Sequence, residues 1–195
     1  MDSVYFLGDS TTAHLSVRGG IPRERIFTGV GSTLLYTSVL DKCIKIGDNV
    51  YSVFEAVRIY SPEILVITVG ASGGAGFLSK DKFKYIYKSL IENIKQASPK
   101  TRIIVQSIYP LSDKSKNHYK KLTKGAVYQA NIWINEVCAE CGVPYIDAHS
   151  LLVDKNGYLK SEYQNDEYLH LTRAAYKVIL DNLYHYLEQN ISLYN

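Results

Sequence analysis

The stretch from Val4 to Thr12, Val-Tyr-Phe-Leu-Gly-Asp-Ser-Thr-Thr, decides the fold. Residues 4–7 form an apolar run with the length and composition of a buried strand. Gly8 and Asp9 end this run, and a helix turn is expected from Ser10 onward. A strand that passes directly into a helix predicts an α/β protein in which Ser10 lies at the carboxyl edge of the sheet.

The rest of the chain alternates between strand-like and helix-like segments. Runs rich in Val and Ile predict strands at residues 64–69, 102–107 and 143–147, and a weaker run predicts one at 25–28. Apolar residues at helical spacing predict helices at 81–97, 123–141 and 172–190. This alternation predicts a three-layer α/β/α sandwich with a five-stranded, parallel, flavodoxin-like sheet.

Length and composition are those of an ordinary globular protein. Of 195 residues, 46% are hydrophobic and 21% are charged, so we expect one domain spanning residues 1–195. The net charge of +3 is small and dispersed, which argues against nucleic-acid binding. The one local excess of positive charge is the set of lysines at 114, 116, 120, 121 and 124. We expect a solvated loop there, with contact to an anionic substrate or surface as the alternative.

Several other classes of protein receive no support from the sequence. The three cysteines, Cys43, Cys138 and Cys141, are an odd number, which argues against a disulfide framework. No apolar segment is long enough to span a membrane and no signal-like stretch precedes Val4, so we expect a cytoplasmic protein. The alternative is a secreted or membrane-tethered protein whose N-terminal segment is not part of this sequence. The sequence has neither metal-ligand spacing nor a phosphate-binding or dinucleotide-binding glycine motif, so we expect no metal and no cofactor.

Ser10 is the candidate nucleophile. At a strand-to-helix turn its hydroxyl would be accessible, and its backbone N–H would be placed to stabilise an oxyanion. The alternative is that Asp9 or Ser10 only caps the helix. A serine nucleophile needs a general base, and His170 is the candidate because Asp166 and Glu167 closely precede it. A carboxylate three residues before a histidine can accept its Nδ1 proton, which favours Glu167.

With these residues the chain resembles the GDSL (SGNH) hydrolase family. The resemblance rests on Gly-Asp-Ser-Thr-Thr at 8–12, the glycines near 31, the loop at 70, Ser-Ile-Tyr-Pro at 107–110 and Glu-Tyr-Leu-His-Leu-Thr at 167–172. It implies a catalytic triad of Ser10, His170 and an acid three residues before the histidine. Family members usually carry Asp at that position, whereas this chain has Glu167 there and Asp166 one residue earlier, so both stay open as the acid.

The resemblance also implies an oxyanion hole. Its donors would be the backbone N–H groups of Ser10 and of a residue near Gly31, together with a side chain after the third strand. Where the family has Gly-x-Asn, this chain has Gly-Ala-Ser at 70–72, so Ser72 replaces an amide donor by a shorter hydroxyl. The loss of one oxyanion donor costs about 10² to 10³ in rate. The residues expected to border the substrate are Asp9, Gly70, Tyr109 and Tyr168.

The expected function is that of a serine esterase or deacetylase. It would hydrolyse a small acyl ester, such as acetyl on a sugar or similar alcohol, through an acyl-Ser10 intermediate. One alternative is an α/β-hydrolase, because residues 70–74 also fit the Gly-x-Ser-x-Gly nucleophile elbow with Ser72 as nucleophile. The glycines that follow Ser72 are a poor helix start, which weakens this alternative. A second alternative is a degenerate domain that binds a glycan or a protein partner without catalysis.

Overall fold

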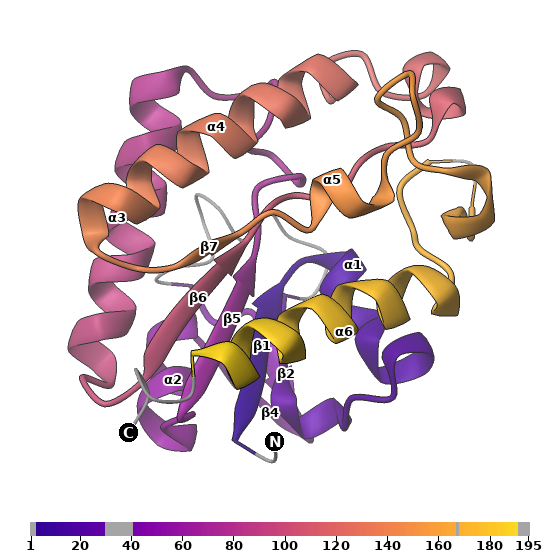
Figure 1. Ribbon diagram of the computed structural model, residues 1–195. Helices are drawn as coiled ribbons and strands as arrows, with labels where there is room; N and C mark the ends of the chain where they lie inside the picture. Colours follow the sequence, from indigo (N-terminus) through magenta and orange to yellow (C-terminus); the bar gives the residue numbers. More distant parts are fainter. Residues whose placement is uncertain (1–2, 30–40, 167, 191–195) are drawn as a thin grey trace.

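The protein is a three-layer α/β/α sandwich around a five-stranded parallel sheet. The computed structural model describes residues 3–29, 41–166 and 168–190 (Figure 1). The strands are β1 (Val4–Gly8), β2 (Ile26–Thr28), β5 (Ile64–Thr68), β6 (Arg102–Gln106) and β7 (Tyr145–Ile146). Their order is β2-β1-β5-β6-β7, and all four pairings are parallel. The predicted sheet and its flavodoxin-like order are therefore confirmed.

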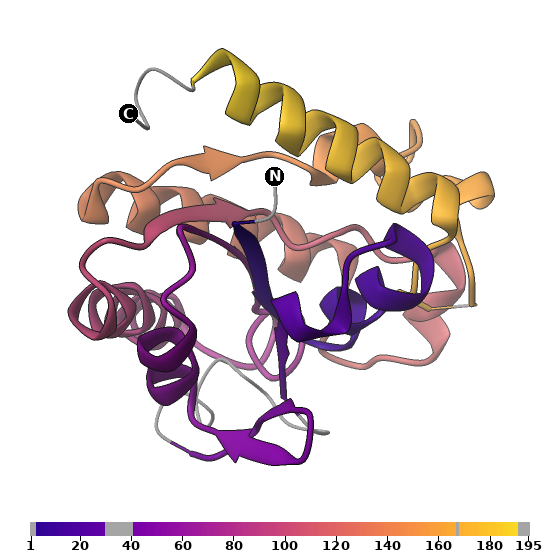
Figure 2. The same ribbon diagram turned by 90° about the horizontal axis from the view of Figure 1, so that it is seen from below.

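Helices cover both faces of this sheet. On one side lie α2 (Val53–Tyr60), α3 (Lys80–Ala97) and α4 (Lys124–Cys141), and on the other lie α6 (Arg173–Gln189) and the short α5 (His149–Leu152) (Figure 2). A short helix, α1 (Ser10–Ala13), follows β1 at the carboxyl edge of the sheet. Helical turns at Leu15–Gly19 and Arg23–Arg25 connect α1 to β2, and further turns lie at Asp113–Asn117 and Ser161–Tyr163.

The two cores follow from the alternation of side chains along each strand. In β5, Leu65 and Ile67 pack into the core beneath α2, α3 and α4, whereas Ile64 and Val66 pack into the core beneath α6. Because successive side chains of a strand point to opposite faces, a strand covered on both sides must be apolar throughout. This explains why the strands appear in the sequence as continuous apolar runs.

Polar side chains cap the helices at their N-termini. Ser79, Thr123 and Thr172 each accept a hydrogen bond from a backbone N–H in the first turn of α3, α4 and α6. Ser52 and Glu55 form a reciprocal capping box at the start of α2. These caps place the helix starts within one residue of the predicted starts of α3, α4 and α6.

The sequence did not predict one feature of the fold, a small β-hairpin before α2. Strands β3 (Ile44–Ile46) and β4 (Asn49–Tyr51) form a small antiparallel hairpin that leads into α2. Gly47 turns this hairpin in the left-handed region, with φ of 59°. Strands of three residues and a helix of eight are too short for a clear hydrophobic period, which is why the alternation of the longer segments did not reveal them.

Among the described residues, no helix is both long enough and apolar enough to cross a membrane.

Candidate active site

Ser10 lies at the first position of α1, directly after β1. Asp9 is the N-cap of this helix, and its carboxylate accepts hydrogen bonds from the backbone N–H and the hydroxyl of Thr11. Gly8 leaves room for this tight turn, because a Cβ there would lie 1.8 Å from Thr12 Oγ1 and 2.7 Å from the Thr68 carbonyl oxygen. The turn thus leaves the Ser10 side chain exposed at the edge of the sheet.

His170 lies on a turn that Asp166 organises. Asp166 Oδ1 accepts hydrogen bonds from the backbone N–H groups of Tyr168, Leu169 and His170, at 2.8, 3.0 and 3.1 Å. This folds the chain so that Asp166 Oδ2 contacts His170 Nδ1. The opposite ring nitrogen, His170 Nε2, lies 3.1 Å from Ser10 Oγ. Serine, histidine and carboxylate therefore form one continuous hydrogen-bonded chain.

A buried tyrosine holds the two halves of this arrangement together. Tyr176, in the first turn of α6, donates a hydrogen bond of 2.5 Å from its hydroxyl to the carbonyl oxygen of Thr11 in α1. Because α6 begins just after His170 and α1 begins with Ser10, this bond fixes the two catalytic candidates relative to each other.

The acid partner of His170 differs from the one that the three-residue spacing favoured. That spacing favoured Glu167, which lies outside the described residues, whereas the observed contact belongs to Asp166, four residues before the histidine. The reason is the turn itself, in which one Asp166 oxygen binds three backbone N–H groups and the other faces the imidazole. Burial raises the pKa of Asp166, but hydrogen bonds from the backbone of Tyr168 and His170 and from the His170 ring outweigh it and lower the pKa overall.

Ser10 and His170 line a cleft of about 280 Å³. Its wall is mostly apolar, and the residues that line it are Asp9, Ser10, Ala71, Ser72, Gly73, Phe77, Tyr119, Leu122, Leu169 and His170. Phe77, Tyr119, Leu122 and Leu169 were not among the predicted site residues. They come from loops after β5, after β6 and before α6, whose lengths can be read from the sequence but whose shapes cannot.

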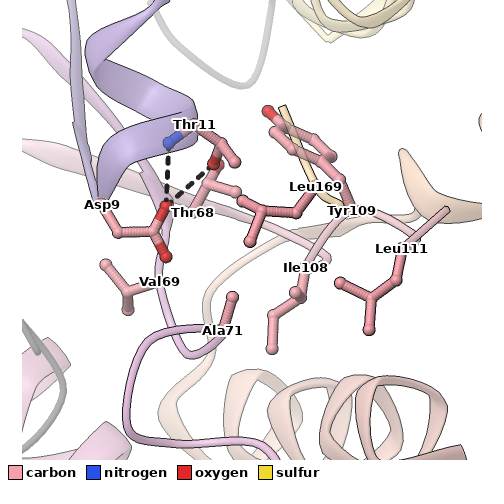
Figure 3. Close-up of a pocket in the computed structure, with 9 residues that line it drawn as sticks. All are labelled: Asp9, Thr11, Thr68, Val69, Ala71, Ile108, Tyr109, Leu111 and Leu169. Carbon is pink, nitrogen blue, oxygen red and sulfur yellow. Dashed lines mark hydrogen bonds between the residues drawn. The ribbon is translucent and has the colours of Figure 1, made fainter. Parts of the chain in front are cut away.

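Beneath the cleft lies a second cavity of about 10 Å³, which has room for roughly one water molecule. Figure 3 shows Asp9, Val69 and Ala71 on one side of it and Leu169, Tyr109, Ile108 and Leu111 on the other. Asp9, Ala71 and Leu169 line both spaces. Burial raises the pKa of Asp9, although hydrogen bonds from Thr11 and from the backbone N–H of Ser72 oppose this effect.

Three residues expected to border the substrate do not line the cleft. Tyr109 is buried and lines the smaller cavity, where its hydroxyl lies 3.3 Å from Gln106 Oε1. Gly70 has a φ of 121°, which favours glycine, and packs closely against Ile108. A Cβ at position 70 would lie only 3.0 Å from Ile108 Cδ1. Tyr168 stacks on His118, with ring centroids 3.9 Å apart, and packs edge to face against the cleft residue Tyr119. Asp9 does line the cleft, as expected.

Of the expected oxyanion donors, Ser10 and Ser72 both lie at the cleft. The Ser10 backbone N–H is at the first helical position of α1, where no intrahelical acceptor exists. Ser72 is exposed, and its backbone N–H donates to Asp9, which leaves its hydroxyl as the available donor. Gly31 lies outside the described residues.

The alternative nucleophile Ser72 lacks the surroundings of an elbow serine. Residues 71–77 form turns, and the next helix, α3, begins only at Lys80. The imidazole nitrogen that would activate a nucleophile is hydrogen-bonded to Ser10 instead. Within the described residues, no cluster of three or more His, Cys, Asp or Glu side chains could hold a metal ion.

Comparison with known families agrees with this geometry. The sequence model of the GDSL-like lipase/acylhydrolase family matches residues 6–178. The chain belongs to this family. The match begins inside β1, ends inside α6, and therefore includes both Ser10 and His170. No curated protein sequence matches the chain significantly.

Several solved structures share the fold. A GDSL-like lipase from Bacteroides thetaiotaomicron has a TM-score of 0.72 and 19% identity, with 96% of this chain and 89% of that chain covered. An acetyl xylan esterase has a TM-score of 0.60 and 17% identity over 94% and 98% of the two chains. The periplasmic domain of a lipopolysaccharide acetyltransferase from Salmonella Paratyphi A has a TM-score of 0.64 and 18% identity over 95% and 83%.

In this GDSL-family protein a second histidine packs against the first. The rings of His14 and His170 meet edge to face, with centroids 4.5 Å apart. His14 lies one turn after Ser10, at the end of the same short helix. Burial lowers the pKa of His14, and the charges of His170 and Arg18 lower it further, whereas Asp166 raises it.

This histidine predicts a pH dependence of stability in the GDSL-family fold. A histidine whose pKa is lower in the folded state binds fewer protons there than in the unfolded state, so the free energy of unfolding falls as the pH falls through about 6.5. We expect His14→Gln to make this acid-side loss shallower in denaturant titrations at several pH values. His185→Gln, at an exposed position on α6, is the matched control and should leave the slope unchanged. Equal slopes for His14→Gln and the parent protein would contradict the prediction.

Proposed function

We propose that this chain hydrolyses carboxylic esters of small acyl groups, such as acetyl on a sugar or similar alcohol, through an acyl-Ser10 intermediate. The observation that carries the proposal is the hydrogen-bonded chain from Asp166 through His170 to Ser10, with 3.1 Å between His170 Nε2 and Ser10 Oγ. This distance is within the reach that proton transfer from a nucleophile to a general base requires. Membership of an acylhydrolase family agrees with ester hydrolysis.

In the first half of the proposed reaction, Ser10 Oγ attacks the carbonyl carbon while His170 Nε2 takes its proton. The carbonyl oxygen becomes an oxyanion, for which the Ser10 backbone N–H and the Ser72 hydroxyl are the candidate donors. The tetrahedral species then collapses, the bond to the alcohol oxygen breaks, and the proton on His170 passes to the leaving alcohol. Asp166 stabilises the imidazolium while it exists, and the lowered pKa of Asp166 keeps it ionised for this role.

In the second half, water replaces the alcohol. His170 Nε2 removes a proton from the water as its oxygen attacks the acyl carbon, and collapse of the second tetrahedral species releases the carboxylic acid and restores Ser10. The acetyl xylan esterase among the structural neighbours supports the choice of a small acyl group.

A binding domain without catalysis is the second candidate, and the observation that favours it is Ser72 in place of the usual asparagine. Labelling with a fluorophosphonate probe separates the two candidates, because only an activated serine reacts. We expect one covalent adduct per chain, located on Ser10 by peptide mass spectrometry and abolished in both Ser10→Ala and His170→Ala. An unlabelled parent protein that also fails to hydrolyse para-nitrophenyl acetate would refute the esterase proposal.

A further inference from the structure

The lysine-rich segment after β6 contributes to the mouth of the cleft. Tyr119 and Leu122 line the cleft that contains Ser10, and Lys120 and Lys121 lie between them in the chain, both exposed. The sequence alone favoured a solvated loop for these lysines. In the structure these two lysines instead lie next to residues that line the cleft, so their charge is close to a bound substrate.

Lys121 is held next to another cleft residue, Phe77. Its Nζ lies 5.6 Å from the centroid of the Phe77 ring, within the range of a cation–π contact. Phe77 lines the cleft, and 49% of it is exposed, which is a large fraction for a phenylalanine. Together they present a positive charge and an aromatic face at the cleft mouth.

Two loops must pack closely for this pair to form. Gly76 has φ of 75°, and a Cβ at that position would lie 2.0 Å from the carbonyl oxygen of Lys121. The loop after β5 and the loop after β6 therefore meet backbone to backbone immediately beside Phe77 and Lys121. A glycine at position 76 is needed both for the left-handed backbone and for this contact. The packing of the two loops therefore brings the backbones of Gly76 and Lys121 together, next to Phe77.

The charge of Lys121 is not compensated by any residue that the structure describes. It forms no ion pair with residues 3–29, 41–166 or 168–190. Two carboxylates near the nucleophile are otherwise engaged, since Asp9 accepts hydrogen bonds from Thr11 and Asp166 contacts His170. Lys124 differs from Lys121, because its Nζ donates to the Asn156 carbonyl oxygen at 2.7 Å and lies over the Tyr158 ring.

We propose that the alcohol part of the substrate carries an anionic group that pairs with Lys121, while the adjoining carbon skeleton lies against Phe77. This proposal rests on the proposed ester hydrolysis at Ser10 and specifies the class of ester. A lysine ammonium is a compact charge that binds carboxylate or phosphate. The pair borders the cleft through Phe77 and supplies none of the candidate oxyanion donors, so it stabilises the bound substrate and the transition state alike. Its loss therefore raises KM and leaves kcat nearly unchanged.

The test compares two acetyl esters that differ in one charge, para-acetoxybenzoate and its uncharged methyl ester. The quantity measured is the ratio of kcat/KM for the anionic ester to kcat/KM for the neutral one. We expect Lys121→Met, which keeps the aliphatic stem, to lower this ratio roughly threefold, and Lys121→Glu to lower it roughly tenfold. High salt should reduce the ratio in the parent protein and have little effect in Lys121→Met.

Lys100→Glu is the matched control, because it makes the same charge change in the exposed turn before β6, at the opposite edge of the sheet. It should leave the ratio unchanged. A ratio that does not respond to either Lys121 substitution, or that responds equally to Lys100→Glu, overturns the proposal. The Lys121 and Lys100 variants should hydrolyse the neutral ester at the same rate as the parent protein. A parent protein that hydrolyses neither ester would refute the esterase function separately.

Binding without turnover provides the independent measurement. In Ser10→Ala protein both esters remain intact, and isothermal titration calorimetry gives their dissociation constants directly. We expect the anionic ester to bind more tightly than the neutral ester and to lose that advantage when Lys121→Glu is added. Equal binding of the two esters overturns the proposal even if the protein proves to be catalytically inactive.

Discussion

Replacing Ser10 by alanine is expected to reduce the turnover of para-nitrophenyl acetate by about 10⁶-fold, to the level left by the oxyanion donors and substrate binding. The reason is that Ser10 Oγ is the hydroxyl hydrogen-bonded to His170 Nε2, at 3.1 Å. Because Ser10 is exposed, the variant should unfold at the same denaturant concentration as the parent. Steady-state kinetics and a denaturant titration of the same preparation check both statements.

The same assay with Ser72 variants distinguishes the two candidate nucleophiles. Ser72→Ala removes at most one oxyanion donor, so the expected loss is no more than about 10² to 10³ in kcat. Ser72→Asn supplies the amide donor that the GDSL family usually has, and should hold or raise the rate because position 72 is exposed and can accept the extra atoms. Loss of all activity in both Ser72 variants, together with a mild effect of Ser10→Ala, would make Ser72 the nucleophile.

The sequence was sufficient to predict the sheet because its strands are covered on both faces. The central residues of these strands had to be apolar on both faces, and this makes β1, β5 and β6 visible without any structural information. The same reasoning placed Ser10 correctly at the carboxyl edge of the sheet, since the position of a turn after a buried strand follows from the strand. It did not reveal the β3–β4 hairpin, whose strands of three residues carry no clear period.

The walls of the site were harder to predict than its centre. Tyr109 was expected at the cleft because it follows β6. Two hydrogen bonds with Asn131 fix the backbone at Ile108, and Tyr109 is buried over the smaller cavity. Phe77 and Tyr119 reach the cleft through loops whose paths depend on a contact between distant backbone segments at Gly76. Such contacts leave no periodic signal in the sequence. Positions on a strand or helix could be predicted, whereas positions on the long loops required the structure.

The second large effect is expected from substituting the acid of the triad. Asp166 should matter more than Glu167, although the three-residue spacing favoured Glu167. We expect Asp166→Asn to reduce kcat for para-nitrophenyl acetate by about 10⁴-fold and Glu167→Gln to change it little. In the asparagine variant the amide oxygen can still accept the backbone N–H groups of Tyr168, Leu169 and His170, so the turn should keep its shape.

The loss in Asp166→Asn would come from the tautomer of His170. The amide nitrogen would replace Oδ2 opposite His170 Nδ1 and donate a hydrogen bond to it, which places the imidazole proton on Nε2. A protonated Nε2 cannot accept the proton of Ser10, although the distance between the two atoms is unchanged. An unaltered melting temperature combined with the loss of kcat would therefore separate this effect from unfolding. A large loss of kcat in Glu167→Gln, together with full activity in Asp166→Asn, would identify Glu167 as the acid of the triad.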